Sequence, residues 1–168
     1  MIHVCSLARL HDTVGETGAR HIVTLLRNTD QVVRPTTVSL ENHLVLSMDD
    51  IVAPMEGYEA PAQPHVERLV DFVSGWDQAA PLVMHCYAGI SRSTAGAFIT
   101  ACALNPSRDE MQIAWALRRA SRTATPNARL VSIADRVLNR NGRMTHAIEA
   151  IGPGDMTYEA DPFRLDLE

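Results

Sequence analysis

Residues 85–93 restrict the possible folds of this 168-residue chain more than any other stretch. The apolar run 81–85 before Cys86 predicts a buried strand, and the small residues after Arg92 predict a slim helix that can lie close to a sheet. Gly89 between them permits a backbone conformation that is closed to most residues. A cysteine and an arginine therefore stand at the two ends of a loop that joins a strand to a helix. This arrangement can hold an oxyanion such as phosphate against a thiolate.

Strand-like runs alternate with helical patterns along the chain, which predicts an α/β domain with a central, mostly parallel sheet flanked by helices. The length fits one domain, residues 1–151, and we expect a C-terminal tail, 152–168, packed on the surface or partly disordered. After Arg92 the pattern is helical almost to the tail. The expected strands are 2–7, 21–26, 43–48 and 81–85, each largely apolar as in strands covered on both faces.

The remaining local signals place helices and one long loop. Residues 8–19 are expected to be helical, with Gly18 helping to end the helix. Residues 49–64 show no sustained period and predict an irregular loop, and loops of this length are commonly functional. Further signals are an apolar stripe from Val66 to Trp76, a capping box of Ser107 with Glu110, Pro126 in a first helical turn, and Gly142 as a helix stop.

The composition excludes several classes of function. Fifteen basic against twenty acidic side chains leave a net charge of −5, which argues against a nucleic-acid partner. No apolar run reaches the roughly 20 residues of a membrane span, and the N-terminus lacks the pattern of a secretory signal. Three irregularly spaced cysteines argue against a disulfide framework, so we expect a cytoplasmic protein. No histidine or cysteine spacing suggests a metal site, and we expect no metal, no organic cofactor and a monomer.

The loop carries groups suited to binding and attacking a phosphate. A thiol becomes a nucleophile when it is deprotonated, which a helix N-terminus and positive charge favour. Arg92 lies six positions after Cys86 and can bind two phosphate oxygens. Ser93 can donate a hydrogen bond to the sulfur, and His85 can orient the loop through backbone carbonyls. The backbone expected to bind the anion belongs to Tyr87, Ala88, Gly89, Ile90, Ser91 and Arg92, and Tyr87 is also expected to line the pocket.

The pattern His-Cys-x-x-Gly-x-x-Arg-Ser at residues 85–93 resembles the signature of the cysteine-dependent protein tyrosine phosphatase superfamily. The run 88–93 is most similar to dual-specificity phosphatases and to small bacterial-type tyrosine phosphatases. The predicted elements from about residue 40 to 105 also follow that family's order. The resemblance implies a two-step reaction, in which Cys86 attacks phosphorus while a general acid protonates the leaving oxygen. The same carboxyl group then acts as the base for the hydrolytic water.

In that family the acid is an aspartate on a mobile loop some thirty residues before the cysteine. Asp50 lies 36 and Asp49 lies 37 positions before Cys86. Strand parity favours Asp50, because Leu44, Leu46 and Met48 would share one face and position 50 continues it. Two alternatives stay open: Asp49 is the acid, or the pair only caps a turn.

The two other cysteines do not repeat the signature. Cys102 has Arg108 six positions later, but it lacks a preceding histidine and an intervening glycine and lies in a helical pattern. We expect it in a helix core, and Cys5 has no matching arginine. A redox role for either thiol stays open. Asn127 follows Pro126 where members of the family that the chain resembles often carry a polar residue near the pocket, but we expect it to be part of a helix start.

These observations predict a phosphatase acting on phosphotyrosine in proteins, with phosphoserine and phosphothreonine as further candidates. One alternative is a phosphoinositide or small-phosphate phosphatase, whose relatives tend to carry lysines inside the loop, where this chain has none. Another is a weakly active module that binds phosphorylated partners, against which the retention of Cys86, Arg92 and a candidate acid argues.

Overall fold

The computed structural model describes residues 1–167, and its centre is a five-stranded sheet in the order β3-β2-β4-β1-β5. The strands β1 to β4 pair in parallel, whereas β5 lies antiparallel to β1 at one edge. All five residues of β4 are buried, as expected for a central strand covered on both faces. The strands are β1 (Ile2–Ser6), β2 (His21–Leu25), β3 (His43–Leu46), β4 (Leu82–Cys86) and β5 (Phe163–Leu165).

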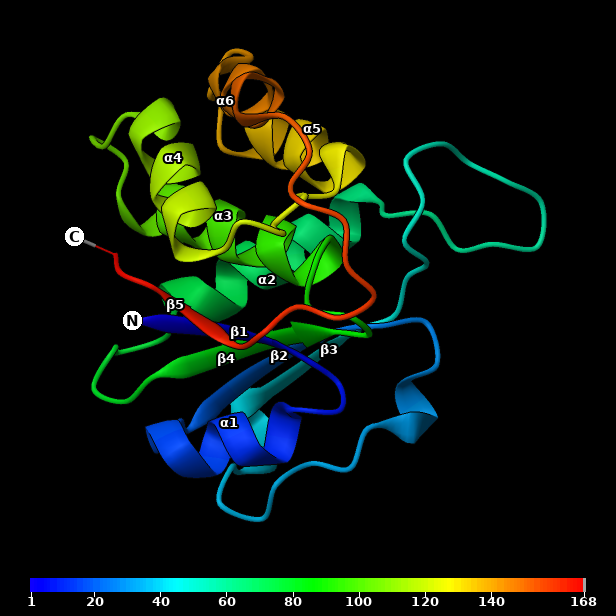
Figure 1. The fold of residues 1–168 in the computed structure, drawn as a ribbon, viewed down its shortest axis with the longest axis vertical. Helices are drawn as coiled ribbons and strands as arrows, with labels where there is room; N and C mark the ends of the chain where they lie inside the picture. Colours follow the sequence, from blue (N-terminus) through cyan, green and yellow to red (C-terminus); the bar gives the residue numbers. More distant parts are fainter. Residues whose placement is uncertain (168) are drawn as a thin grey trace.

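Helices cover the two faces of the sheet unequally. Helix α1 (Leu10–Thr17) lies on one face, and the other helices lie on the opposite face (Figure 1). These are α2 (Gln63–Ser74), α3 (Arg92–Leu104), α4 (Glu110–Ala120), α5 (Ala128–Val137) and α6 (Arg143–Ile151). The larger core therefore lies between the sheet and α2 to α6, and the smaller one lies under α1. No helix in residues 1–167 is long and apolar enough to cross a membrane.

Helix α3 lies against the sheet because its first turns carry small side chains. Residues 92–102 are all buried. A Cβ at Gly96 would lie 3.2 Å from Sδ of Met84 and 3.4 Å from Cδ1 of Leu25, closer than most side chains tolerate. The sequence prediction of a slim helix after Arg92 is confirmed. This close packing fixes the start of α3 relative to the end of β4.

The α/β class, the parallel sheet and the four expected strands are confirmed, but two of the predicted helix-capping signals are wrong. Gly18 does end α1, with a φ of 68°. Helix α4 is capped by Asp109 instead of Ser107, since the Asp109 carboxylate accepts from the amide of Gln112 at 3.0 Å. Gly142 precedes α6 instead of ending α5, because the buried carboxylate of Asp135 accepts from its amide at 2.6 Å.

The segment 152–167, here called the C-terminal strap, adds one short strand to the sheet. Its strand β5 pairs with β1, with Leu165 opposite Ile2. Leu165 and Leu167 are buried. The Arg118 guanidinium donates to the carbonyl of Gly152 at 2.6 Å and so fixes the start of the strap. The strap therefore closes the edge of the sheet that β1 would otherwise expose.

Candidate active site

The end of β4 and the start of α3 bring the two signature residues together. Cys86 is the last residue of β4 and Arg92 the first of α3, so the 86–92 loop spans the gap between sheet and helix. Both side chains are mostly buried, with 2% of Cys86 and 8% of Arg92 exposed. The loop therefore lies at the C-terminal edge of the parallel strands, where ligands bind in open α/β sheets.

The carbonyl groups of this loop are held by the surrounding scaffold. Because the carbonyl of one residue and the amide of the next point in opposite directions, each carbonyl held from outside turns the following amide toward the space above the sulfur. The hydrogen bonds of residues 1–167 include none donated by the amides of 87–91, so these amides are available for an anion. In each bond that holds the loop, a backbone amide outside it or in α3 donates to a loop carbonyl. The donor and acceptor residues are Leu7 and Tyr87 (3.1 Å), Ala160 and Ala88 (2.9 Å), Thr125 and Ile90 (2.9 Å), and Ala95 and Ser91 (2.9 Å).

Gly89 is required for two independent reasons. Its φ is 75°, a region that residues with a side chain rarely adopt. A Cβ at this position would also lie only 2.9 Å from the backbone carbon of Cys5 and 3.0 Å from the amide nitrogen of Ser6. Any side chain here would push the loop away from β1.

Ser93 contacts the sulfur of Cys86, and His85 contacts its backbone carbonyl. The hydroxyl of Ser93 lies 3.1 Å from Sγ of Cys86. His85 is fully buried, and burial lowers its pKa to about 4. The ring is therefore neutral at ordinary pH and carries a single N–H.

The position of that proton follows from the neighbours of His85. Its Nδ1 faces the carbonyl of Cys86 at 3.3 Å and therefore donates, since a carbonyl only accepts. Its Nε2 then accepts from the hydroxyl of Thr24 at 2.7 Å. The hydroxyl of Thr24 has a single proton, which it gives to His85. His43 must therefore donate to the Thr24 oxygen from its own Nε2, at 2.8 Å. This series of hydrogen bonds orients the peptide group that follows the cysteine.

Arg92 is held so that part of its guanidinium stays free. One terminal nitrogen donates to the carbonyl of Met48 at 2.9 Å, which ties the side chain to the segment after β3. Its Nε is buried without a hydrogen-bond partner in the described chain, and the carboxylate oxygen of Asp50 nearest to it is 4.0 Å away. A buried charged donor without a partner is costly, and a bound oxyanion would satisfy it.

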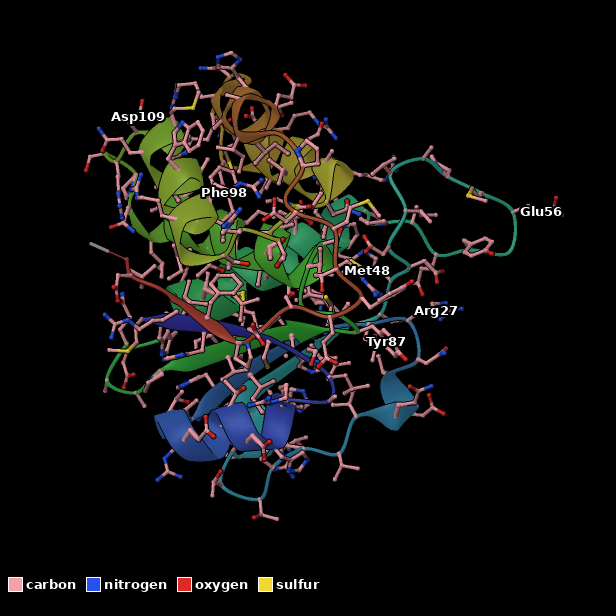
Figure 2. The ribbon with its side chains drawn as sticks, viewed as in Figure 1. Arg27, Met48, Glu56, Tyr87, Phe98 and Asp109 are labelled. Carbon is pink, nitrogen blue, oxygen red and sulfur yellow. The ribbon has the colours of Figure 1, made fainter. Side chains whose placement is uncertain are left out.

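The two candidate acids occupy different environments. One carboxylate oxygen of Asp50 accepts from the hydroxyl of Ser91 at 2.7 Å, so this side chain faces the 86–92 loop. Asp49 instead accepts from the amide of Glu59 at 2.7 Å and lies 3.5 Å from the guanidinium of Arg27. It closes the base of the loop that projects beyond residue 50 (Figure 2). The geometry favours Asp50 over Asp49 as the group that meets a substrate.

Asn127 contributes to the site in a way that its sequence context did not reveal. Its side-chain oxygen caps α5 by accepting from the amide of Leu130 at 3.1 Å, as expected for a residue that begins a helix. Its side-chain nitrogen also donates to Asp50 at 2.8 Å. The Pro126–Asn127 pair was a local signal, but it specified only the cap.

A pocket of about 210 Å³ opens beside these groups, here called the Arg92 pocket. Tyr87 is one of the residues that line this pocket, and 66% of its surface is exposed. Figure 2 labels its side chain just beyond the end of β4. The other lining residues of this pocket are Leu26, Arg27, Asn28, Gln31, Asp49, Asp50 and Arg92.

Neither of the other cysteines is among the residues that line this pocket. Cys102 is fully buried in α3 and Cys5 is buried in β1. Burial raises the pKa of each thiol to about 12, so both stay protonated and unreactive at ordinary pH. The prediction that Cys102 belongs to a helix core is confirmed.

Comparison with known families agrees with this geometry. Residues 6–106, more than half of the chain, match the family model Tc-R-P, described as "Polymorphic toxin system, DSP-PTPase phosphatase". None of the curated proteins matches the sequence.

Solved structures share the fold at low identity. The phosphatase PTP-2 of Cydia pomonella is 18% identical with a TM-score of 0.62, over 80% of this chain and 84% of that one. Human DUSP28 is 15% identical with a TM-score of 0.64, over 83% and 89%. PTPMT1 in complex with PI(5)P is 13% identical with a TM-score of 0.61, over 89% and 93%. These similarities show the tyrosine phosphatase fold.

Proposed function

This chain belongs to the polymorphic toxin system DSP-PTPase phosphatases and is a cysteine-dependent phosphatase, and on that premise we propose its substrate and mechanism. It hydrolyses phosphotyrosine in proteins, with phosphoserine and phosphothreonine as further substrates, through a cysteinyl-phosphate intermediate. The observation that carries this proposal is the set of unpaired donors around one sulfur. The amides of 87–91 and the buried Nε of Arg92 have no hydrogen-bond partner among the described residues, and donors of this kind stabilise an oxyanion.

In the first step Cys86 acts as the nucleophile. Its thiolate attacks phosphorus, and the S–P bond forms as the bond to the leaving oxygen breaks. Asp50 gives its proton to that oxygen, so the substrate leaves as a neutral alcohol or phenol. The loop amides and Arg92 stabilise the charge on the three remaining oxygens.

In the second step water replaces the sulfur. The Asp50 carboxylate takes a proton from the attacking water, an O–P bond forms, and the S–P bond breaks. The Ser93 hydroxyl, 3.1 Å from Sγ, donates to the sulfur as it becomes a thiolate again. Inorganic phosphate leaves, and Asp50 carries the proton needed for the next cycle.

The charges around the Arg92 pocket support a substrate with a single phosphate. Besides Arg92, the lining contains only one other cation, Arg27, which lies 3.2 Å from Glu59 and 3.5 Å from Asp49. A lipid headgroup with several phosphates requires more uncompensated cations. PTPMT1, whose structure holds PI(5)P, shares the fold, so inositol lipids belong in the test.

The test compares p-nitrophenyl phosphate, a phosphopeptide panel and inositol lipids as substrates. Wild type should turn over the first two, and Cys86→Ser should abolish turnover. Cys102→Ala is the matched control, because it removes a thiol that lies outside the site. Preference for inositol lipids over every phosphopeptide would replace the proposed substrate class. Undetectable turnover of all three would leave a phosphate-binding module.

A further inference from the structure

A second pocket adjoins the Arg92 pocket, with Tyr87 as the shared wall. It measures about 280 Å³ and is here called the strap pocket, because the C-terminal strap forms one of its sides. We propose that it binds an arginine or lysine side chain next to the phosphorylated residue of a protein substrate. This inference rests on the proposed function and adds a preference for a cationic flank. The strap pocket is lined by Leu7, Ala8, Tyr87, Ala88, Tyr158 and Glu159.

A carboxylate is fixed in this pocket. The Ser6 hydroxyl donates to Oε1 of Glu159 at 2.5 Å, and Ser6 is itself fully buried. The hydrogen bonds of residues 1–167 include no partner for the second oxygen, Oε2. One oxygen of Glu159 is thus fixed by Ser6, and the other is available to accept. A carboxylate held in this way can bind a guanidinium or ammonium group.

Arg9, which lines a pocket together with Glu159, already has a partner for its charge. Arg9 lines a neighbouring depression together with Glu159 and Asp161, but its guanidinium lies 3.8 Å from Asp12 and forms its ion pair there. The strap side of the depression therefore carries two carboxylates, Glu159 and Asp161, with no ion pair among the described residues. An incoming cation would meet net negative charge.

Aromatic rings complete the cation site. Tyr87 is 66% exposed and Tyr158 fully exposed, and both line the pocket. The face of a tyrosine ring attracts a cation, most strongly an arginine guanidinium. A pocket lined by a carboxylate and two such rings selects a long cationic side chain over an apolar or acidic one.

The position of the pocket links this preference to catalysis. Ala88, a lining residue, also belongs to the 86–92 loop, and its carbonyl accepts from the amide of Ala160 next to Glu159 at 2.9 Å. A substrate whose phosphate lies on the loop amides therefore places its neighbouring residues over Tyr87. The strap pocket is the cavity on that side.

The experiment measures kcat/KM for phosphotyrosine peptides in which one flanking position carries arginine, glutamine or glutamate. Each value is normalised to the same variant's turnover of p-nitrophenyl phosphate. Wild type should prefer the best arginine peptide over its glutamine counterpart by about five-fold, the effect of an exposed ion pair strengthened by an aromatic face. High salt should weaken this preference.

Three variants test the assignment. Glu159→Gln keeps an acceptor for Ser6 but removes the charge, so it should abolish the preference, and Glu159→Lys should favour the glutamate peptide. Tyr158→Ala alters a fully exposed side chain and should reduce the preference about two-fold without affecting folding. Glu149→Gln, on the exposed face of α6, is the matched charge control and should behave as wild type.

The outcomes separate this inference from the proposed function. Equal turnover of the arginine and glutamine peptides by an active enzyme would overturn the subsite and leave the phosphatase proposal intact. Binding of the same peptides with a non-hydrolysable phosphonate, measured by calorimetry, tests the subsite even if turnover is absent. Equal affinities of wild type and Glu159→Gln for the arginine phosphonate peptide would also overturn it.

Discussion

The side-chain amide of Asn127 donates to the carboxylate of Asp50 at 2.8 Å, across 77 residues of sequence. This bond connects the N-terminus of α5 to the segment after β3. Ser91 donates to the same oxygen of Asp50 from the 86–92 loop at 2.7 Å. The candidate acid is thus held between two elements that the sequence places far apart.

Replacing Asn127 should separate its two roles. Asn127→Ser keeps a good helix cap, so the melting temperature should stay close to that of wild type. It loses the amide that orients Asp50, and kcat should fall about ten-fold, the effect of one hydrogen bond to a charged group. Thermal melts and steady-state kinetics check both expectations. An unchanged kcat would show that Asn127 serves only as the cap.

Asp50 and Asp49 should differ sharply as variants. Asp50→Asn should lower kcat by roughly 10²-fold or more and remove the fall in rate at basic pH that a general acid produces. The effect should be larger for phenyl phosphate than for a substrate with a good leaving group. Asp49→Asn disturbs only the base of the projecting loop and should retain the pH profile. The assignment of the acid is wrong if the two variants exchange these behaviours.

Folding stability should depend on pH through His85. Burial lowers its folded-state pKa from 6.5 to about 4. As pH falls through this window the unfolded chain binds a proton that the folded chain does not, so stability is lost below about pH 6.5. At pH 5 the loss from His85 alone is about 2 kcal/mol.

Urea denaturation at pH 7 and pH 5 measures this dependence. His85→Asn retains an amide donor but does not titrate, so its stability should fall less between the two pH values. Comparing this loss of stability in wild type and in His85→Asn removes the contribution of the partly buried histidines, such as His3, His21 and His43. Identical losses would mean that His85 is not the group responsible.

The C-terminal strap should support anion binding through a single backbone bond. Ala160→Pro removes the amide that holds the carbonyl of Ala88, and the affinity for the phosphate analogue vanadate should fall several-fold. Ala160→Ser keeps that amide and is the matched control. Equal vanadate inhibition of the two variants would mean that the strap does not position the loop.

The sequence was most informative where the signal is local. The 86–92 loop, the buried strand before it and the slim helix after it are coded by adjacent residues, and the structure has all three elements. The parity of Leu44, Leu46 and Met48 also held, since all three are buried, although β3 ends at Leu46.

Contacts between distant residues could not be predicted in this way. The helix cap alone is enough to explain an asparagine at position 127, so the local sequence does not indicate its bond to Asp50. Strand β5 has only three residues, and its pairing depends on the free edge of β1. Neither contact is set by neighbours in sequence, because each requires the assembled sheet.

The central claim is that Cys86 carries the phosphoryl group between the two steps. Rapid acid quench of Asp50→Asn with phosphorus-labelled p-nitrophenyl phosphate tests it. The nitrophenolate leaves without protonation, whereas the variant lacks the base that activates the hydrolytic water, so the intermediate should accumulate. Peptide mapping by mass spectrometry should locate the phosphate on Cys86. Phosphate found on another residue, or turnover by Cys86→Ser at the wild-type rate, would contradict the account.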